Sequence, residues 1–353
     1  MSRDFLQLLR DRSAFDPAPR HSELHDVHVP FDDLLGTGTC ENALVAGVRR
    51  GERIALVGAS GSGKSSIIAG TLGPLVEGVF PISVPVAVER GEVATDTVEF
   101  VRHVVRTVSR MISAQLPALG RTGRQLAEGA EQPPERISRF TASLPLPASL
   151  RPALAYELNR IAREPAPTGA QVIDQGRALL ELVADDGLTP VLVLDDTDRW
   201  LSSLRTDSEA LRRRFFTTVP RLLAEDLAVP AVVAVHPTYL ADSAYRDARG
   251  FLSTTINVPA VPGPSGLIRV LGRRVEIACY DIESTPDERH AIQRAATQVL
   301  TPAAGQRLFD HYASGPSDLR RNVLLVAHTA LALALDDDAG QLEQGHVELA
   351  VTS

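Results

Sequence analysis

The sequence predicts an α/β fold: a mostly parallel five-stranded sheet with helices on both faces, followed by a small helical domain. Short apolar runs of strand length alternate with segments that have the apolar spacing of helices. A cluster of proline and glycine at residues 259–264 ends this alternation. Beyond that cluster the chain has helical spacing to its last residues.

Five apolar runs predict the strands. Ile54–Val57 is the first, and Val84–Val88 is the second, which Pro85 places at a sheet edge because proline cannot donate to a strand ladder. Pro190–Leu194 and Ala231–Val235 are apolar throughout, as expected for central strands that are covered on both faces. Thr255–Val258 is predicted to be the fifth strand.

The same patterns divide the chain into an N-terminal arm (1–30), an α/β domain (31–262) and a helical domain (263–353). The α/β domain contains a predicted helix at Val98–Ile112 and a helical insertion rich in proline, glycine and alanine at about 113–170. The clearest helices of the last domain are predicted at Leu267–Ala278, Pro286–Leu300 and Ser317–Leu335.

The arm has two features that require an explanation. Phe5, Leu6, Leu8 and Leu9 form a short apolar stripe, which either packs back onto the body or binds a partner. His21, His25 and His28 share one helical face, a spacing that can hold a metal ion. No carboxylate or cysteine frame accompanies these histidines, so the favoured interpretation of the arm contains no metal site.

Composition restricts the environment and the partners. The net charge of −8 disfavours non-specific coating of nucleic acid, although local arginine patches could still contact DNA. Cys40 and Cys279 are too few for a disulfide framework, as expected in a reducing cytoplasm. The sequence has neither a signal peptide nor an apolar run long enough to span a membrane, so we expect a cytoplasmic protein with no membrane partner.

A phosphate-binding loop is the most specific motif. Gly58, Ala59, Ser60, Gly61, Ser62, Gly63, Lys64, Ser65 and Ser66 follow the first strand and open a helix, in the pattern GxxxxGK[ST]. Lys64 is the only lysine of the chain, among 36 basic residues. A compact ammonium can reach phosphates inside a tight loop, whereas a guanidinium fork fits there poorly. The loop therefore predicts that the chain binds ATP, with Ser65 as a ligand of Mg²⁺.

Acidic and polar residues follow the third and fourth strands. Asp195 is predicted to hold Mg²⁺, and Asp196 to polarise the attacking water, with Asp198 as the alternative. His236 follows the fourth strand and could hold that water or contact the γ-phosphate, with Thr238 as the alternative. A purely structural histidine at this strand end is an equally open interpretation.

In the order and spacing of these motifs, the chain resembles the AAA+ P-loop ATPases over residues 31–335, in particular the origin-recognition-type initiators and their prokaryotic relatives. Residues 31–36 and the helix through Glu41 look like the family's segment that frames the adenine. The resemblance implies that 263–353 is a lid domain. It also implies an arginine finger, Arg249 in preference to Arg246, that reaches a neighbouring subunit's nucleotide. In residues 314–321, which look like the lid motif, Arg320 would face the γ-phosphate.

Two departures leave alternatives open. Residues 195–199 look more like the STAND and KAP-like branches than like the Asp-Glu pair of vigorous motors. The given sequence also ends soon after the region that resembles the lid, so we expect no winged-helix domain like that of the initiators. We expect a regulatory or assembly ATPase that forms homo- or hetero-oligomers and acts on a protein partner. A STAND-like nucleotide-gated switch with weak hydrolysis and a DNA-associated loader or transposition-helper ATPase remain the alternatives.

Overall fold

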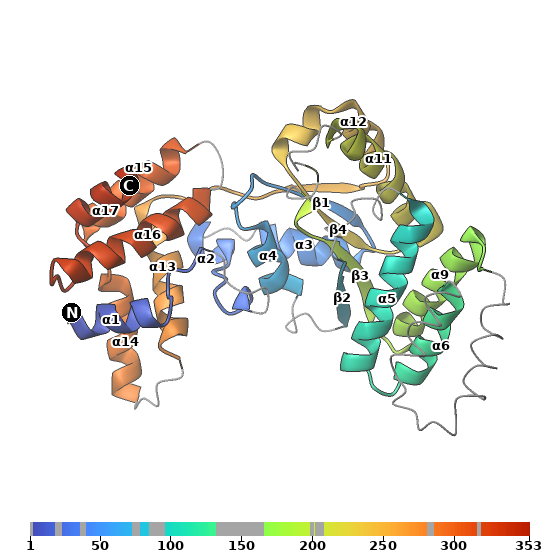
Figure 1. The fold of residues 1–353 in the computed structure, drawn as a ribbon, viewed down its shortest axis with the longest axis horizontal. Coiled ribbons are helices and arrows are strands. Elements are labelled where there is room, and N and C mark those ends of the chain that lie inside the picture. Colours follow the sequence, from blue (N-terminus) through green and yellow to red (C-terminus); the bar gives the residue numbers. More distant parts are fainter. Residues whose placement is uncertain are drawn as a thin grey trace, which may run out of the picture.

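A computed structural model defines the fold over residues 3–17, 23–35, 40–72, 78–84, 96–131, 166–197, 201, 208–280, 286–315 and 319–353. Its sheet has five parallel strands in the order β2-β3-β4-β1-β5 (Figure 1). The strands are β1 (Arg53–Val57), β2 (Val79–Ser83), β3 (Thr189–Leu194), β4 (Ala231–Val235) and β5 (Thr254–Asn257). The predicted fold class is confirmed.

The structure corrects the position of the second strand. We predicted it at Val84–Val88, but β2 runs through Val79–Ser83, and residues 85–88 lie outside the described residues. Phe80, Ile82 and Val84 alternate toward the interior, which is the period of a half-buried strand. The strand is at the sheet edge, where its proline, Pro81, is tolerated.

Helices cover both faces of the sheet. On one face, inward side chains of β3 and β4 pack against α5 (Thr97–Gln115), α9 (Gly169–Asp185) and α11 (Ser208–Arg221). On the other face, alternate side chains of β1, β3 and β4 pack against α2 (Phe31–Leu35), α3 (Cys40–Arg49) and α4 (Lys64–Leu72). The central strands are therefore buried from both sides, which explains why their sequences are apolar throughout.

The remaining elements of the α/β domain lie beside these layers. The predicted insertion begins inside α5 and contains α6 (Gly120–Ala130), while residues 132–165 lie outside the described residues. Three short elements border β4 and β5: the π-helical turn η3 (Leu222–Asp226), the 3₁₀ turn η4 (Pro237–Ala241) and α12 (Ser243–Ala248).

The C-terminal helices form a separate bundle (Figure 1), and this helical domain has its own apolar core. It is built from α13 (Pro264–Ala278), α14 (Pro286–Gln298), α15 (Pro302–Ser314), α16 (Leu319–Asp336) and α17 (Gln344–Thr352). The arm's first helix, α1 (Arg3–Asp11), packs on α16, with Leu6 and Leu9 fully buried in this core. The apolar stripe of the arm therefore packs onto the body of the same chain.

Arginines of α13 hold the backbone that leads from α1 to the α/β domain. We call residues 23–35 the strap. Arg273 donates to the carbonyl of Asp26 at 2.9 Å, and Arg269 to the carbonyl of Asp33 at 2.5 Å. Arg274 donates to the carbonyl of Asp16 at 2.9 Å, and burial lowers the pKa of this guanidinium to about 10. The strap is thus attached along one helix of the helical domain.

Candidate nucleotide-binding site

The loop at residues 58–66 connects the end of β1 to the start of α4. The N–H of Gly58 donates to the carbonyl of Val235 at 3.1 Å, which joins the loop to β4. Gly61 and Gly63 have φ values of 74° and 97°, in a region that side chains rarely tolerate. The sequence therefore needs glycine here to turn the loop so that α4 begins at Lys64.

Lys64 folds back over this loop. Its Nζ donates to the carbonyl of Gly58 at 2.7 Å and to the carbonyl of Ala59 at 3.1 Å, and only 6% of the residue is exposed. An ammonium makes both contacts from a narrow stem, which a planar fork cannot reproduce in the same space. The positive charge is held inside the loop, where phosphate oxygens would bind.

Arg320, near the start of α16, lies against the same loop. A Cβ at Gly63 would overlap the guanidinium of Arg320, and the Cζ of Arg320 lies 4.5 Å from the centre of the Phe31 ring. Its Nε and Nη2 are shielded from solvent and have no hydrogen-bond partner among the described residues. Burial lowers the pKa of Arg320, because shielding disfavours the charged form.

The acidic residues Asp195 and Asp196, which follow β3, are more exposed to solvent than the lysine of the loop. Asp195 is half-buried and Asp196 is exposed, and the N–H of Asp196 donates to Oδ1 of Asp195 at 2.8 Å. The φ of Asp196 is 53°, a backbone region that is sparsely populated except by glycine, asparagine and aspartate. The buried hydroxyl of Thr197 donates to the carbonyl of Ala234, so it ties this turn to β4. Asp198, the alternative to Asp196, lies outside the described residues.

His236 follows β4 on the same edge of the sheet. Its Nδ1 lies 2.7 Å from Oγ1 of Thr238 and accepts a hydrogen bond from the N–H of Thr238 at 3.3 Å. His236 therefore caps the short turn η4, which is the structural role that the sequence left open. The two polar candidates at this strand end are hydrogen-bonded to each other.

Arg249 lies at the C-terminal end of α12 and is exposed, as is Arg246. The structure therefore brings Arg320, but not Arg249, into contact with the loop of its own chain. A side chain that reaches into another subunit must be exposed. The position of Arg249 is therefore compatible with the expected arginine finger.

Sequence reasoning missed a pair of residues beside the loop. His28 of the strap lies 3.1 Å from the hydroxyl of Ser66 through Nδ1 and 3.2 Å from Oε1 of Glu41 through Nε2. Glu41 also accepts a hydrogen bond from the N–H of Phe31 at 2.9 Å. The only sequence signal was the histidine spacing of the arm, for which a metal site was the disfavoured interpretation and a contact with α4 was not considered.

The residues present fit a nucleoside triphosphate. The cradle at Gly63 has no room for a Cβ, Lys64 sits within the loop, and Arg320 presents shielded N–H groups. Ser65 and Asp195 offer a hydroxyl and a carboxylate, donors suited to Mg²⁺ that keeps water and phosphate ligands as well. No cluster of three or more His, Cys, Asp or Glu side chains that could bind a metal occurs in the described part of the chain, so a dedicated protein cage is absent there.

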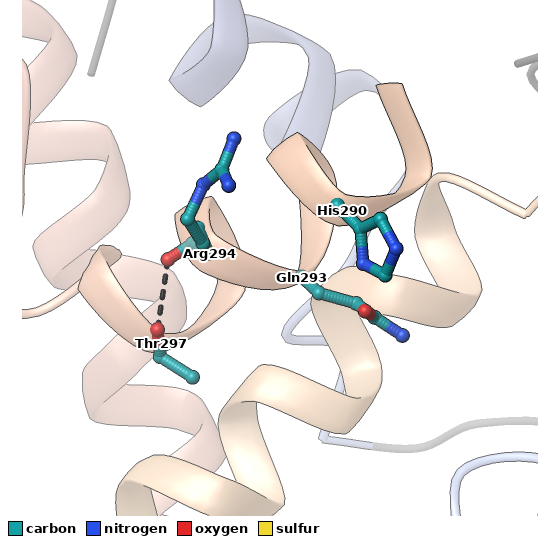
Figure 2. Close-up of a pocket in the computed structure, with 4 residues that line it drawn as sticks. All are labelled: His290, Gln293, Arg294 and Thr297. Atoms are coloured by element: carbon teal, nitrogen blue, oxygen red, sulfur yellow. Dashed lines mark hydrogen bonds between the residues drawn. The ribbon is translucent and has the colours of Figure 1, made fainter. Parts of the chain in front are cut away.

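A pocket on the helical domain is lined by none of the candidate nucleotide-binding residues. His290, Gln293, Arg294 and Thr297 line it, all from α14, and Figure 2 shows the Arg294 guanidinium directed away from His290 and Gln293. The hydroxyl of Thr297 donates to the carbonyl of Arg294 at 2.8 Å. None of these residues belongs to the predicted site.

A profile of the AAA domain family matches residues 18–239, which is more than half of the chain. The chain therefore belongs to the AAA domain family, and the expected membership of the AAA+ P-loop ATPases is confirmed. No curated protein sequence matches the chain significantly.

Two solved structures of the Aeropyrum pernix ORC2 protein, its ADPNP-ADP complexes and its ADP form, are similar to this chain. Each is 14% identical to it, with TM-scores of 0.47 and 0.46. The similarity covers 89% of this chain and 66% of each ORC2 chain, so the chain spans just under two thirds of their length.

Within the described residues, no helix has the length and apolar character that crossing a membrane requires.

Proposed function

We propose that the protein is an AAA+ ATPase that binds ATP with Mg²⁺, hydrolyses it, and acts as a regulatory or assembly ATPase whose site is completed by a neighbouring subunit. One observation carries the proposal: a shielded guanidinium, whose Nε and Nη2 have no hydrogen-bond partner among the described residues, lies against a glycine-rich loop that already contains Lys64. Such an arrangement is electrostatically unfavourable until an anion binds between the charges.

Each residue then has a task in binding or hydrolysis. Lys64 and the N–H groups at the start of α4 bind phosphate oxygens, and Arg320 adds charge from the lid side. Ser65 and Asp195 would hold Mg²⁺, which neutralises charge on the phosphates when bound. Asp196 orients the attacking water and draws its proton, and His236, at the end of the neighbouring strand, is a further polar candidate. Arg249 of a neighbouring subunit stabilises charge that builds up on the transferring phosphoryl group.

Lys64→Arg tests the binding step. We expect titration calorimetry with ATP and Mg²⁺ to show the loss of most of the affinity, although the charge is unchanged, because the fork cannot enter the loop. Arg10→Lys, an arginine–lysine exchange at an exposed position of α1, is the control and should bind like the wild type. Unchanged ATP binding by Lys64→Arg would overturn the proposed phosphate loop.

A nucleotide-gated switch with slow hydrolysis is the second candidate. Asp196 favours it, because many vigorous ATPases of this kind have a glutamate at this position and the shorter side chain holds a water less closely. Specific ATPase activity measured against protein concentration separates the two. A rise with concentration supports the neighbour-completed ATPase, and a constant low rate supports the switch.

The partner is part of the same proposal. The acidic chain favours a protein partner over DNA. A titration with duplex DNA at several salt concentrations tests this, because binding through phosphate contacts weakens steeply as salt rises. The DNA-associated alternative requires DNA binding that weakens as the salt concentration rises.

A further inference from the structure

His28 joins three parts of the molecule that are distant in sequence. Its Nδ1 lies 3.1 Å from the hydroxyl of Ser66, which is the third residue of α4, and its Nε2 lies 3.2 Å from Oε1 of Glu41 on α3. The His28 and Glu41 side chains are only 6% and 12% exposed. The imidazole thus lies between a carboxylate and a hydroxyl, shielded from solvent.

Close packing holds the imidazole at this position. A Cβ at Gly70 would overlap Cδ2 of His28, so the ring rests directly on the backbone of α4. Glu41 is held in turn by the N–H of Phe31, at 2.9 Å. Burial raises the pKa of Glu41, but the contacts with His28 and Phe31 outweigh it and keep the pKa below its usual value. Glu41 is therefore a charged group that faces Nε2 of the ring at ion-pair distance.

This arrangement determines what Ser66 can do. A serine hydroxyl rotates freely unless a partner takes one of its hydrogen-bonding positions. His28 takes one of them, so the remaining donor or acceptor position of Ser66 has a defined direction. Because Ser66 is the last residue of the loop and lies in the first turn of α4, that direction matters for any phosphate bound at the start of the helix.

We propose that His28 is a positioning residue for the nucleotide, which acts by holding the Ser66 hydroxyl toward the bound phosphates while Glu41 holds His28. This inference rests on the proposed nucleotide binding but assigns a task to a residue outside the loop and the lid. The competing explanation is that His28 and Glu41 only attach the strap to the α/β domain.

Two substitutions separate these explanations. In His28→Asn a polar atom remains near the place of Nδ1, so the contact with Ser66 is kept and that with Glu41 is lost. In His28→Gln the longer amide reaches toward the place of Nε2, so the contact with Glu41 is kept and that with Ser66 is lost. A positioning role requires the asparagine variant to bind better, and an attachment role requires the glutamine variant to be the more stable without affecting affinity.

The measurement is the affinity for ADP with Mg²⁺, by calorimetry, together with melting temperatures of the nucleotide-free proteins. We expect His28→Gln to weaken ADP binding about fivefold, the effect of one neutral hydrogen bond, and His28→Asn to stay within about twofold of the wild type. Equal losses in both variants, or no loss in either, would overturn the positioning role.

A double-mutant cycle adds a second criterion. If His28 acts through Ser66, His28→Gln should have no further effect on ADP affinity in a Ser66→Ala background. Fully additive losses would mean that His28 acts independently of Ser66, and the proposal would be wrong.

Gly70→Ala tests the same contact without changing His28. The added methyl group displaces the imidazole, so ADP affinity should fall as in His28→Gln, and the fall should disappear in the Ser66→Ala background. Gly345→Ala is the matched control, because it is also helical and has nothing within 4 Å of the added atom. Unchanged affinity in Gly70→Ala would contradict the positioning role. Wild-type protein that binds no ADP would instead refute the proposed function.

Discussion

The loop side and the acidic side of the candidate nucleotide-binding site differ in how far their side chains are buried. On the loop side, Lys64 is buried within the loop, and the guanidinium of Arg320 is shielded between Gly63 and Phe31. On the acidic side, Asp196 and Arg249 are exposed. Contacts that would bind phosphate are thus completed inside one chain, whereas groups assigned to hydrolysis face outward. Under the proposed function, this difference would allow a single chain to bind nucleotide and would restrict hydrolysis to an assembly.

The largest effect should come from Arg249→Ala, which removes the outward arginine. Arginines that act in trans contribute about 10³-fold or more to phosphoryl transfer, so we expect ATPase activity to fall by about that factor with ATP binding unchanged. Steady-state hydrolysis and calorimetry on the same preparation measure the two effects.

Mixing variants tests whether Arg249 acts between subunits. Arg249→Ala mixed with Asp196→Asn should recover activity, because some interfaces pair an intact site with an intact finger. Arg320→Ala mixed with Asp196→Asn should recover none, since the intact lid and the intact acid are never in one subunit. No recovery in the first mixture, with both proteins folded and associated, would refute the finger assignment.

The two acids should differ from each other. Asp196→Asn is expected to reduce hydrolysis about 100-fold and to leave binding of ATP with Mg²⁺ largely intact. Asparagine tolerates the positive φ of this position, so the backbone is not the cause of the loss. Asp195→Asn should instead weaken the Mg²⁺-dependent part of binding. Equal and mild effects of both substitutions would favour Asp198 or the switch.

Arg320→Met should lower the affinity for ATP without lowering stability. Methionine fills the space without a charge, so the nucleotide-free protein should melt at the same or a higher temperature. ATP affinity should fall roughly 10- to 100-fold, because contacts between charged groups and phosphate are lost. Lower stability with unchanged affinity would make Arg320 a structural residue and would remove the contrast between the two sides.

The smallest expected effect is that of Thr197→Val, which removes the buried hydrogen bond between the turn at 195–197 and β4. The carbonyl of Ala234 loses its donor, so the free energy of unfolding should fall by about 1 kcal/mol, with nucleotide affinity unchanged. Chemical denaturation measures it, and Thr217→Val, at an exposed hydroxyl on α11, is the control. A large loss of affinity would mean that the turn at 195–197 takes part in binding.

The sequence predicts the fold well because its signals are local. Central strands have no polar face, and the loop has its glycines and Lys64 within nine residues, so β1, β3, β4 and the start of α4 follow directly. At the sheet edge the signal is weaker, because residues 79–88 contain two adjacent apolar runs and the sequence alone does not distinguish the observed strand at Val79–Ser83 from the second run.

The long-range part of the site could not be predicted from spacing. His28 and Ser66 are 38 positions apart, and nothing near either residue indicates the other. Arg320 was placed by resemblance to a family motif, and its contact with Gly63 depends on how the lid packs. Such contacts are decided by tertiary structure, which composition and periodicity do not encode.

The packing of α1 on α16 has a consequence for the order of folding. Leu6 and Leu9 find their partners in helices made from the other end of the chain, with the whole sheet encoded between them. During synthesis the sheet can form while this first helix still exposes its apolar face, and the lid core closes only after α16 has emerged. The contact between α1 and α16 therefore forms only after the sheet has been synthesised.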